Sequence, residues 1–191
     1  MNFLGHLYLS GDEPLTIVGN FMADSVKGRD LSAYPEAVRR GIILHRAIDT
    51  FTDQHPLFVT GRARARIHMG RYAGVVMDLF YDHLLAVHWE RWHPERLADY
   101  AQRMYALLHT HRELLPERTR HMLPYMIHGD WLTSYASMDG LSQALAGLSR
   151  RASQGSIMLG AERILAGNLE AYRTEFEAFL PLIEQHVEPL R

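Results

Sequence analysis

The residues best suited to chemistry are histidines, aspartates and asparagines that recur four positions apart in otherwise apolar segments. The pairs are Asn2 and His6, Asn20 and Asp24, His45 and Asp49, Asp49 and Asp53, and Asp78 and Asp82. Residues four apart lie on the same face of a helix. A solvated edge or a capping interaction explains any single pair equally well, so the pairs carry weight only together.

The segment "VVMDLFYDHLLAVHW" (75–89) has the composition of a buried helix, yet it contains Asp78, Asp82 and His83. An ionised carboxylate alone in an apolar interior costs on the order of tens of kcal/mol, so such groups are usually paired, neutralised or bound to a metal. Asp24 in "IVGNFMADSV" and His45 in "GIILHRAID" have similarly apolar neighbours. We therefore expect these groups to converge on a cation.

The chain has no cysteine, which excludes thiolate ligands and disulfides. Histidine nitrogens with carboxylate oxygens suit a divalent ion such as manganese, magnesium, iron or zinc. Such an ion polarises a phosphoryl oxygen and lowers the pKa of a bound water. Arg46, next to His45, could hold a phosphate through its paired donors. A salt bridge from Arg46 to Asp49 or Asp53 explains this arginine equally well.

Apolar periodicity and the positions of the prolines predict an all-α fold with almost no strand pattern. The predicted helical segments are 2–10, 13–27, 35–53, 56–68, 70–92, 94–115, 118–130, 135–149 and 157–187. Pro181 is expected to kink or interrupt the last segment. With no internal repeat and no long linker, residues 1–191 are expected to form one helical bundle domain.

Composition excludes several classes of function. The chain has 191 residues, is 47% hydrophobic and carries a formal net charge of −2, which is typical of a globular protein and gives no sign of nucleic-acid binding. No apolar run is long enough to cross a membrane, and the first residues lack the basic region of a signal peptide, so a cytoplasmic location is expected. The ExxH motif occurs once, at 90–93, whereas a di-iron bundle needs it twice.

Five separated blocks together resemble one known family. They are "MNFLGHLYLS" (1–10), "GNFMADSVKG" (19–28), "HRAIDTFTD" (45–53), "MDLFYDHLLAVHW" (77–89) and "DWLTSYASMD" (130–139). In this order and spacing they resemble the acyl carrier protein phosphodiesterases, a divergent branch of the HD phosphohydrolases. The resemblance extends over nearly the whole chain.

The resemblance implies an HD-domain-like fold and a manganese-dependent hydrolysis. The substrate would be holo-acyl carrier protein, whose phosphopantetheine is joined to a serine by a phosphodiester, and the products would be apo-carrier protein and 4'-phosphopantetheine. The chain departs from the usual HD signature, since His45 is followed by Arg46 and the only adjacent pair is reversed, Asp82–His83. Ligands therefore cannot be transferred position by position.

The expected site combines the resemblance with the apolar setting of the polar residues. The expected metal ligands are Asp24, His45, Asp78 and Asp82. His6 and His83 are expected as further ligands or acid–base groups, and Asp49 as a ligand, a base or the partner that orients His45. Asn20 and Arg46 are expected to hold phosphate or to fix neighbouring carboxylates.

The resemblance also implies a docking surface, because acyl carrier proteins are small, acidic and helical. "TGRARARIHMGR" (60–71) supplies Arg62, Arg64, Arg66 and Arg71. A basic patch of this kind steers association, although a solvated helix face explains each arginine as well. Two other readings remain open at this point, namely hydrolysis of a nucleotide or another small phosphodiester, and a helical binding module without catalysis.

Overall fold

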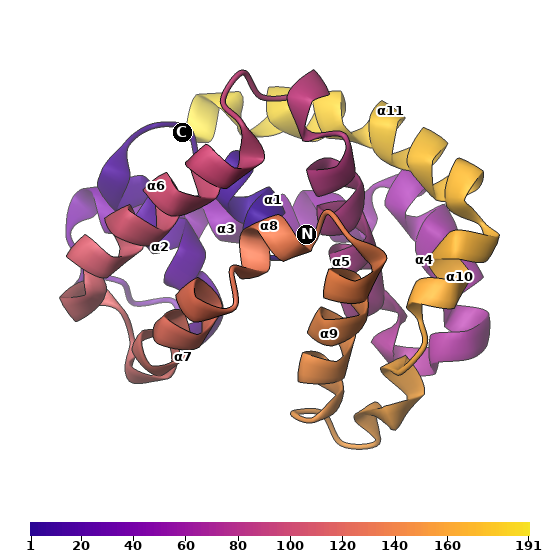
Figure 1. Cartoon of the computed structure of the whole chain (residues 1–191). Helices are drawn as coiled ribbons and strands as arrows, with labels where there is room; N and C mark the ends of the chain where they lie inside the picture. Colours follow the sequence, from indigo (N-terminus) through magenta and orange to yellow (C-terminus); the bar gives the residue numbers. More distant parts are fainter.

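The computed structural model describes all 191 residues and contains helices but no strand (Figure 1). The α-helices are α1 (Phe3–Tyr8), α2 (Pro14–Met22), α3 (Glu36–Gln54), α4 (Pro56–Met69), α5 (Ala73–Val87), α6 (Leu97–Thr110), α7 (Glu117–His128), α8 (Trp131–Ser134), α9 (Met138–Ser149), α10 (Glu162–Gly167) and α11 (Leu169–Val187). The short 3₁₀ turns are η1 (Ala23–Ser25), η2 (Gly70–Tyr72), η3 (Trp89–Arg91), η4 (Arg112–Leu114), η5 (Gly155–Met158) and η6 (Glu188–Leu190). The all-α prediction is confirmed.

The helix boundaries differ from the prediction mainly in the last third of the chain. The segment 157–187 is two helices, α10 and α11, and they meet at Asn168. Of the kink or interruption expected at Pro181, the interruption is wrong, because α11 continues through it to Val187. Pro181 is exposed, so water can bond the backbone carbonyl that the missing N–H leaves free.

One hydrophobic core joins the helices, and α5 runs through it. Tyr81 of α5 packs edge-on against Phe58 of α4 and against Phe176 of α11, with ring centroids 5.2 and 5.3 Å apart. Edge-to-face aromatic pairs stabilise such contacts beyond the burial of their area. The packing fixes α5 as the support on which the N-terminal residues rest. No helix of the structure is both long and apolar enough to cross a membrane.

Two glycines allow α2 and α3 to cross at backbone contact. A Cβ atom on Gly19 would lie 2.1 Å from the carbonyl oxygen of Val38, and one on Gly41 would lie 2.1 Å from that of Thr16. No side chain fits at either position without separating the two helices. The close crossing matters for function because it brings Asn20 of α2 against His45 of α3.

We predict that Gly41→Ala lowers the free energy of unfolding by about 1–3 kcal/mol, because the new methyl group forces α2 away from α3. Urea unfolding followed by circular dichroism measures this change. Gly147→Ala in α9 is the matched control, since its new Cβ meets nothing closer than 3.9 Å. That control should be neutral or slightly stabilising. An equal loss in both variants would contradict the crossing argument.

Candidate functional site

Two acidic residues of α5 hold the first residues of the chain in place. The carboxylate of Asp82 accepts hydrogen bonds from the backbone N–H groups of Asn2, Leu4 and Gly5, at 3.0, 2.8 and 3.1 Å. It is fully buried and acts as the N-terminal anion of α1. Burial raises the pKa of Asp82 to about 7, although these N–H groups act in the opposite direction. Asp78 accepts from the Met1 ammonium at 2.9 Å.

Asn20 orients two histidines from different helices. Its side-chain nitrogen donates to the carbonyl oxygen of His6 and to the hydroxyl of Ser10, which turns its side-chain oxygen towards the two imidazole rings. That oxygen lies 3.0 Å from Nδ1 of His6 and 3.0 Å from Nδ1 of His45. Since an amide oxygen only accepts, both Nδ1 atoms must carry hydrogen. The Nε2 atoms of both rings are then the nitrogens available to a ligand.

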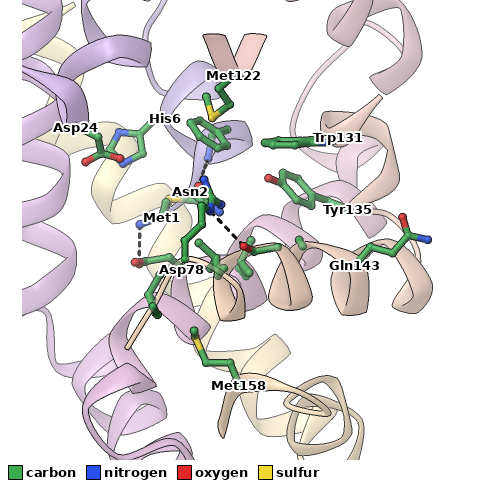
Figure 2. A pocket seen from close by; sticks show the side chains of 18 of the residues that line it. Met1, Asn2, His6, Asp24, Asp78, Met122, Trp131, Tyr135, Gln143 and Met158 are labelled. Carbon is green, nitrogen blue, oxygen red and sulfur yellow. Dashed lines mark hydrogen bonds and ion pairs between the residues drawn. The ribbon is translucent and has the colours of Figure 1, made fainter. Parts of the chain in front are cut away.

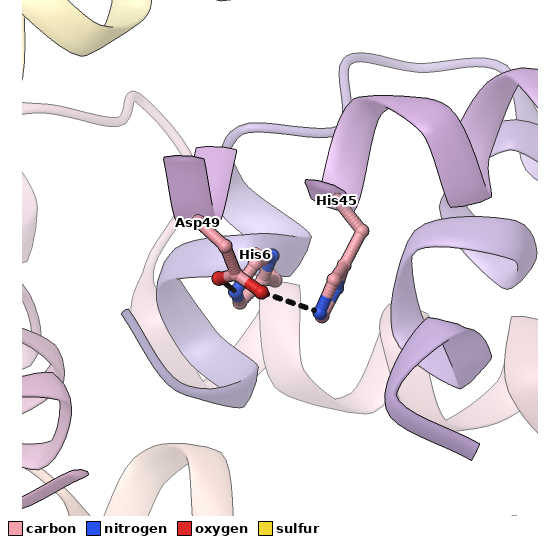
Figure 3. Close-up of side chains that lie close together, drawn as sticks. All are labelled: His6, His45 and Asp49. Carbon is pink, nitrogen blue, oxygen red and sulfur yellow. Dashed lines mark ion pairs between the residues drawn. The ribbon is translucent and has the colours of Figure 1, made fainter. Parts of the chain in front are cut away.

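The two Nε2 atoms converge on one carboxylate. Asp49 places one oxygen 3.2 Å from Nε2 of His6 and the other 3.2 Å from Nε2 of His45 (Figure 3). The rings are stacked, with centroids 3.9 Å apart. The ligand atoms of His6, His45 and Asp49 all lie within 4.8 Å of one another, which is the spacing a bound metal ion requires. Asp24 adds a second carboxylate, 3.3 Å from Nε2 of His45.

The pKa shifts in this cluster show that its carboxylates favour a positive charge close to the two rings. Burial alone would lower the pKa of His45, but hydrogen bonds to Asp24 and Asp49 raise it to about 9. Burial and the charge on His45 together lower the pKa of His6 to about 4. Against the effect of burial, the contacts with His45 and His6 hold the pKa of Asp49 well below its usual value. One cationic imidazole therefore sits where a divalent cation would fit.

The cluster opens into a cleft of about 860 Å³. Figure 2 shows His6 and Asp24 on one side of Asn2, with Trp131 and Tyr135 on the other. Phe3, Phe21, Met122, Trp131 and Met158 provide apolar lining, and Gln143 adds a polar group. The apolar lining, here called the groove, shares this cleft with the cluster of nitrogen and oxygen donors. Such a cleft suits a substrate in which a charged group is joined to a less polar arm.

The structure brings His6, Asn20, Asp24, His45 and Asp49 together, but it does not bring the other expected site residues into this group. Asp78 lines the cleft yet pairs with Met1, and Asp82 caps α1. The Nδ1 atom of His83 lies 2.8 Å from the carbonyl oxygen of Tyr135. Arg46 donates to the carbonyl oxygen of Gly28 at 2.8 Å and forms no salt bridge to Asp49 or Asp53.

Sequence reasoning gave no role to several cleft residues. Phe3 and Met122 are apolar residues that the sequence does not distinguish from core residues, and three arginines that line the cleft, Arg118, Arg150 and Arg151, lie outside the basic run of 60–71. The only signal for Arg150 and Arg151 is position, since they begin "RRASQGS" (150–156), the stretch with the most linker-like composition. No sequence pattern shows that this segment faces the same cleft as α1.

Comparison with known proteins shows the family of the chain. The family model described as acyl carrier protein phosphodiesterase matches residues 1–183. Proteins named acyl carrier protein phosphodiesterase are similar over nearly the whole chain. One from Yersinia pestis is 31% identical over 100% of this chain and 90% of its own length, and one from Serratia proteamaculans is 30% identical over 98% of both. No solved structure matches the chain. This chain belongs to the acyl carrier protein phosphodiesterase family.

Proposed function

We propose that this protein hydrolyses the phosphodiester that joins 4'-phosphopantetheine to a serine of holo-acyl carrier protein. The observation that carries the proposal is the convergence of His6 Nε2, His45 Nε2 and Asp49 within 4.8 Å, in a cleft of about 860 Å³. Membership of the family supports the choice of carrier protein as substrate. The expected place of action is the cytoplasm, where carrier proteins work.

The donor set fits a divalent cation. Two imidazole nitrogens and carboxylate oxygens, without sulfur, suit Mn²⁺, with Mg²⁺, Fe²⁺ and Zn²⁺ as alternatives. The Nδ1–H groups of both histidines bond to Asn20, which is the outer contact that metal-binding histidines usually make. When bound, such an ion polarises a phosphoryl oxygen and lowers the pKa of a water molecule. The likeness to HD phosphohydrolases remains a prediction.

The proposed ligands are His6, His45 and Asp49, with Asp24 as a fourth. Asp24 is the most accessible of the four, with its side chain 77% exposed, so its carboxylate can contact substrate or water as well as the ion. Asp78 and Asp82 are left out of this set because their oxygens already bond to Met1 and to the backbone of α1. Their proposed task is to position α1 and hence His6.

The cleft residues would bind the arm of the substrate. Trp131 and Met122 line the groove with Phe3, and apolar walls of this kind pack against an extended pantetheine chain while excluding water. The exposed end of the groove would leave the protein part of the substrate outside. The phosphodiester, which joins the arm to the protein part of the substrate, would then lie near Asp24 and Asp49.

We predict that incubation of holo-acyl carrier protein with this protein and Mn²⁺ removes one phosphopantetheine group, as measured by mass spectrometry. His45→Ala and Asp49→Ala should abolish the reaction because each removes a ligand, and a chelator should stop the wild-type reaction until Mn²⁺ is restored. His68→Ala, at an exposed histidine outside the cleft, is the matched control. Nucleotides serve as a parallel substrate, and their preferential hydrolysis would refute the choice of carrier protein.

We predict that Asn20→Ala lowers the affinity for Mn²⁺ by about 10–100-fold, because His6 loses the acceptor of its Nδ1–H and His45 keeps only the backbone carbonyl oxygen of residue 20. Isothermal titration measures the affinity. Ser10→Ala is the control, since the Ser10 hydroxyl bonds to the Asn20 side-chain nitrogen and to the carbonyl oxygen of His6 but to neither imidazole ring. The control should bind Mn²⁺ with near wild-type affinity. Wild-type affinity in Asn20→Ala would refute the orienting role.

We predict that Asp82→Asn lowers the free energy of unfolding by about 1–3 kcal/mol, because a buried carboxylate loses charge-assisted bonds to α1. The folded fraction should still bind Mn²⁺ within a few-fold of the wild-type affinity. Asp99→Asn, at an exposed position in the first turn of α6, is the control and should change stability little. Loss of Mn²⁺ binding without loss of stability would return Asp82 to the ligand set.

The basic run of α4 remains a predicted docking surface, but much of its charge is neutralised. Arg64 forms a two-point salt bridge to Glu175, and Arg62 bonds to Asp53 at 2.8 Å. Arg71 donates to the carbonyl oxygen of Ser153. Arg66 is exposed and forms no ion pair with a carboxylate. Arg66 is therefore the member of the run that can be changed without breaking an existing contact.

If α4 contacts the carrier protein, Arg66→Gln should raise the KM for holo-carrier protein and leave the rate on a small artificial phosphodiester unchanged. The reason is that a surface charge steers the partner without touching the reacting phosphate. Steady-state kinetics with both substrates measures the difference. Equal effects on the two substrates would count against docking at α4.

A further inference from the structure

Three arginines line the cleft, and they are its only lysine or arginine side chains. Arg118 belongs to the first turn of α7, and Arg150 and Arg151 follow the end of α9. All three are exposed. None forms an ion pair with a carboxylate, although Arg40, Arg62, Arg64, Arg91, Arg103, Arg112, Arg120 and Arg173 each do so elsewhere. These three guanidinium groups therefore have no carboxylate partner within the chain.

The arginines stand on two different walls of the cleft. Figure 1 shows α7 and α9 on either side of the N-terminal residues. Besides burial, the charges of Arg118 and Arg150 lower the pKa of Arg151, so the three guanidinium groups lie close enough to repel one another. A repulsion maintained across an opening is relieved when an anionic partner enters between the charges. The geometry therefore favours a ligand that contacts both walls.

A hydroxyl pair links one wall to the metal-binding cluster. Thr119 Oγ1 donates to Ser25 Oγ at 2.8 Å, and Ser25 directly follows Asp24, which contacts His45. On the other wall, the Nε–H of Arg151 donates to the carbonyl oxygen of Gly147 at 3.1 Å. The basic residues, the cluster and the apolar groove thus belong to one cleft.

We propose that Arg118, Arg150 and Arg151 form the docking surface for the acidic face of the carrier protein that surrounds its modified serine. The inference rests on the proposed function and adds to it the place where the protein part of the substrate binds. The groove lined by Phe3, Met122 and Trp131 accepts the arm, so the folded protein attached to that arm must rest at the mouth.

Charge complementarity identifies the occupant. Guanidinium groups that bind a single phosphate converge on one point, whereas these three are exposed and divided between two walls. Such a distribution matches several carboxylates spread over a helical surface. Unlike Arg62 and Arg64 of α4, which are already paired with carboxylates, the three arginines of the cleft remain available to the carboxylates of a partner.

The test uses the full chain with Mn²⁺ and two sets of variants with the same change in charge. Arg150→Gln with Arg151→Gln, and Arg118→Gln alone, remove charge from each wall. The control combines Arg96→Gln with Arg163→Gln, because both residues are exposed, lack a carboxylate partner and lie outside the cleft. Three quantities are measured: KM and kcat with holo-carrier protein, binding of apo-carrier protein by surface plasmon resonance, and affinity for Mn²⁺.

We expect the Arg150 and Arg151 double variant to raise KM and weaken apo-carrier binding by about tenfold or more, with a shallower dependence on salt. Its kcat and Mn²⁺ affinity should stay near the wild-type values, and Arg118→Gln should show a smaller shift in the same direction. Replacement of Arg150 and Arg151 by lysine should restore most of the binding, since a positive charge remains. The control double variant should behave as wild type.

Three results would overturn the inference. Equal weakening in the control would show that net charge alone matters, and a fall in kcat without a change in KM would place the arginines at the reacting phosphate. Stronger binding of a single-stranded oligonucleotide than of apo-carrier protein would identify another class of partner. A fourth result would separate the two proposals. If the wild-type protein binds apo-carrier protein through these arginines but leaves holo-carrier protein intact, the proposed reaction is refuted and the docking surface is supported.

Discussion

The functional centre depends on one amide oxygen that accepts hydrogen bonds from two imidazole rings. The side chain of Asn20 cannot rotate freely, because its nitrogen bonds to the backbone of His6 and to Ser10. Its oxygen then fixes the hydrogen on the near nitrogen of each ring and leaves the far nitrogens directed at Asp49. Asn20, which is neutral and fully buried, therefore sets which ring nitrogens are available for a cation that His6, His45 and Asp49 would hold together.

The rest of the fold maintains the positions of the helices that meet at this amide. The glycine crossing of α2 and α3 sets the distance between Asn20 and His45, and any side chain at the crossing would increase it. On the opposite side, α5 holds α1 through the carboxylate of Asp82, and α1 carries His6. The aromatic contacts of α5 with α4 and α11 keep that support rigid. The core therefore acts on the chemistry through helix positions.

The sequence was sufficient for the fold class and for part of the site, and the physical reason differs for each part. Helical periodicity reports local structure, so the all-α class and the limits of α3 and α4 followed from the pattern. His45 and Asp49 share one helix face, which spacing alone reveals. The apolar sequence around Asp82 is what a buried metal ligand would also have. The partners of Asp82 lie about 80 positions away, in and before α1, and the periodicity of a sequence does not show contacts between distant segments. The continuity of α11 through Pro181 likewise depends on exposure, which only the packed structure defines.

The hydrogen bond between Thr119 and Ser25 has a mechanical consequence. It joins the start of α7, one wall of the cleft, to the turn that carries Asp24. Outward movement of α7 to admit a bulkier guest would either break this bond or draw the Asp24 carboxylate away from His45. The width of the cleft at α7 and the distance from Asp24 to His45 are therefore not independent. A molecule that moves α7 outward would also move Asp24, whose side chain is the most exposed of the cluster.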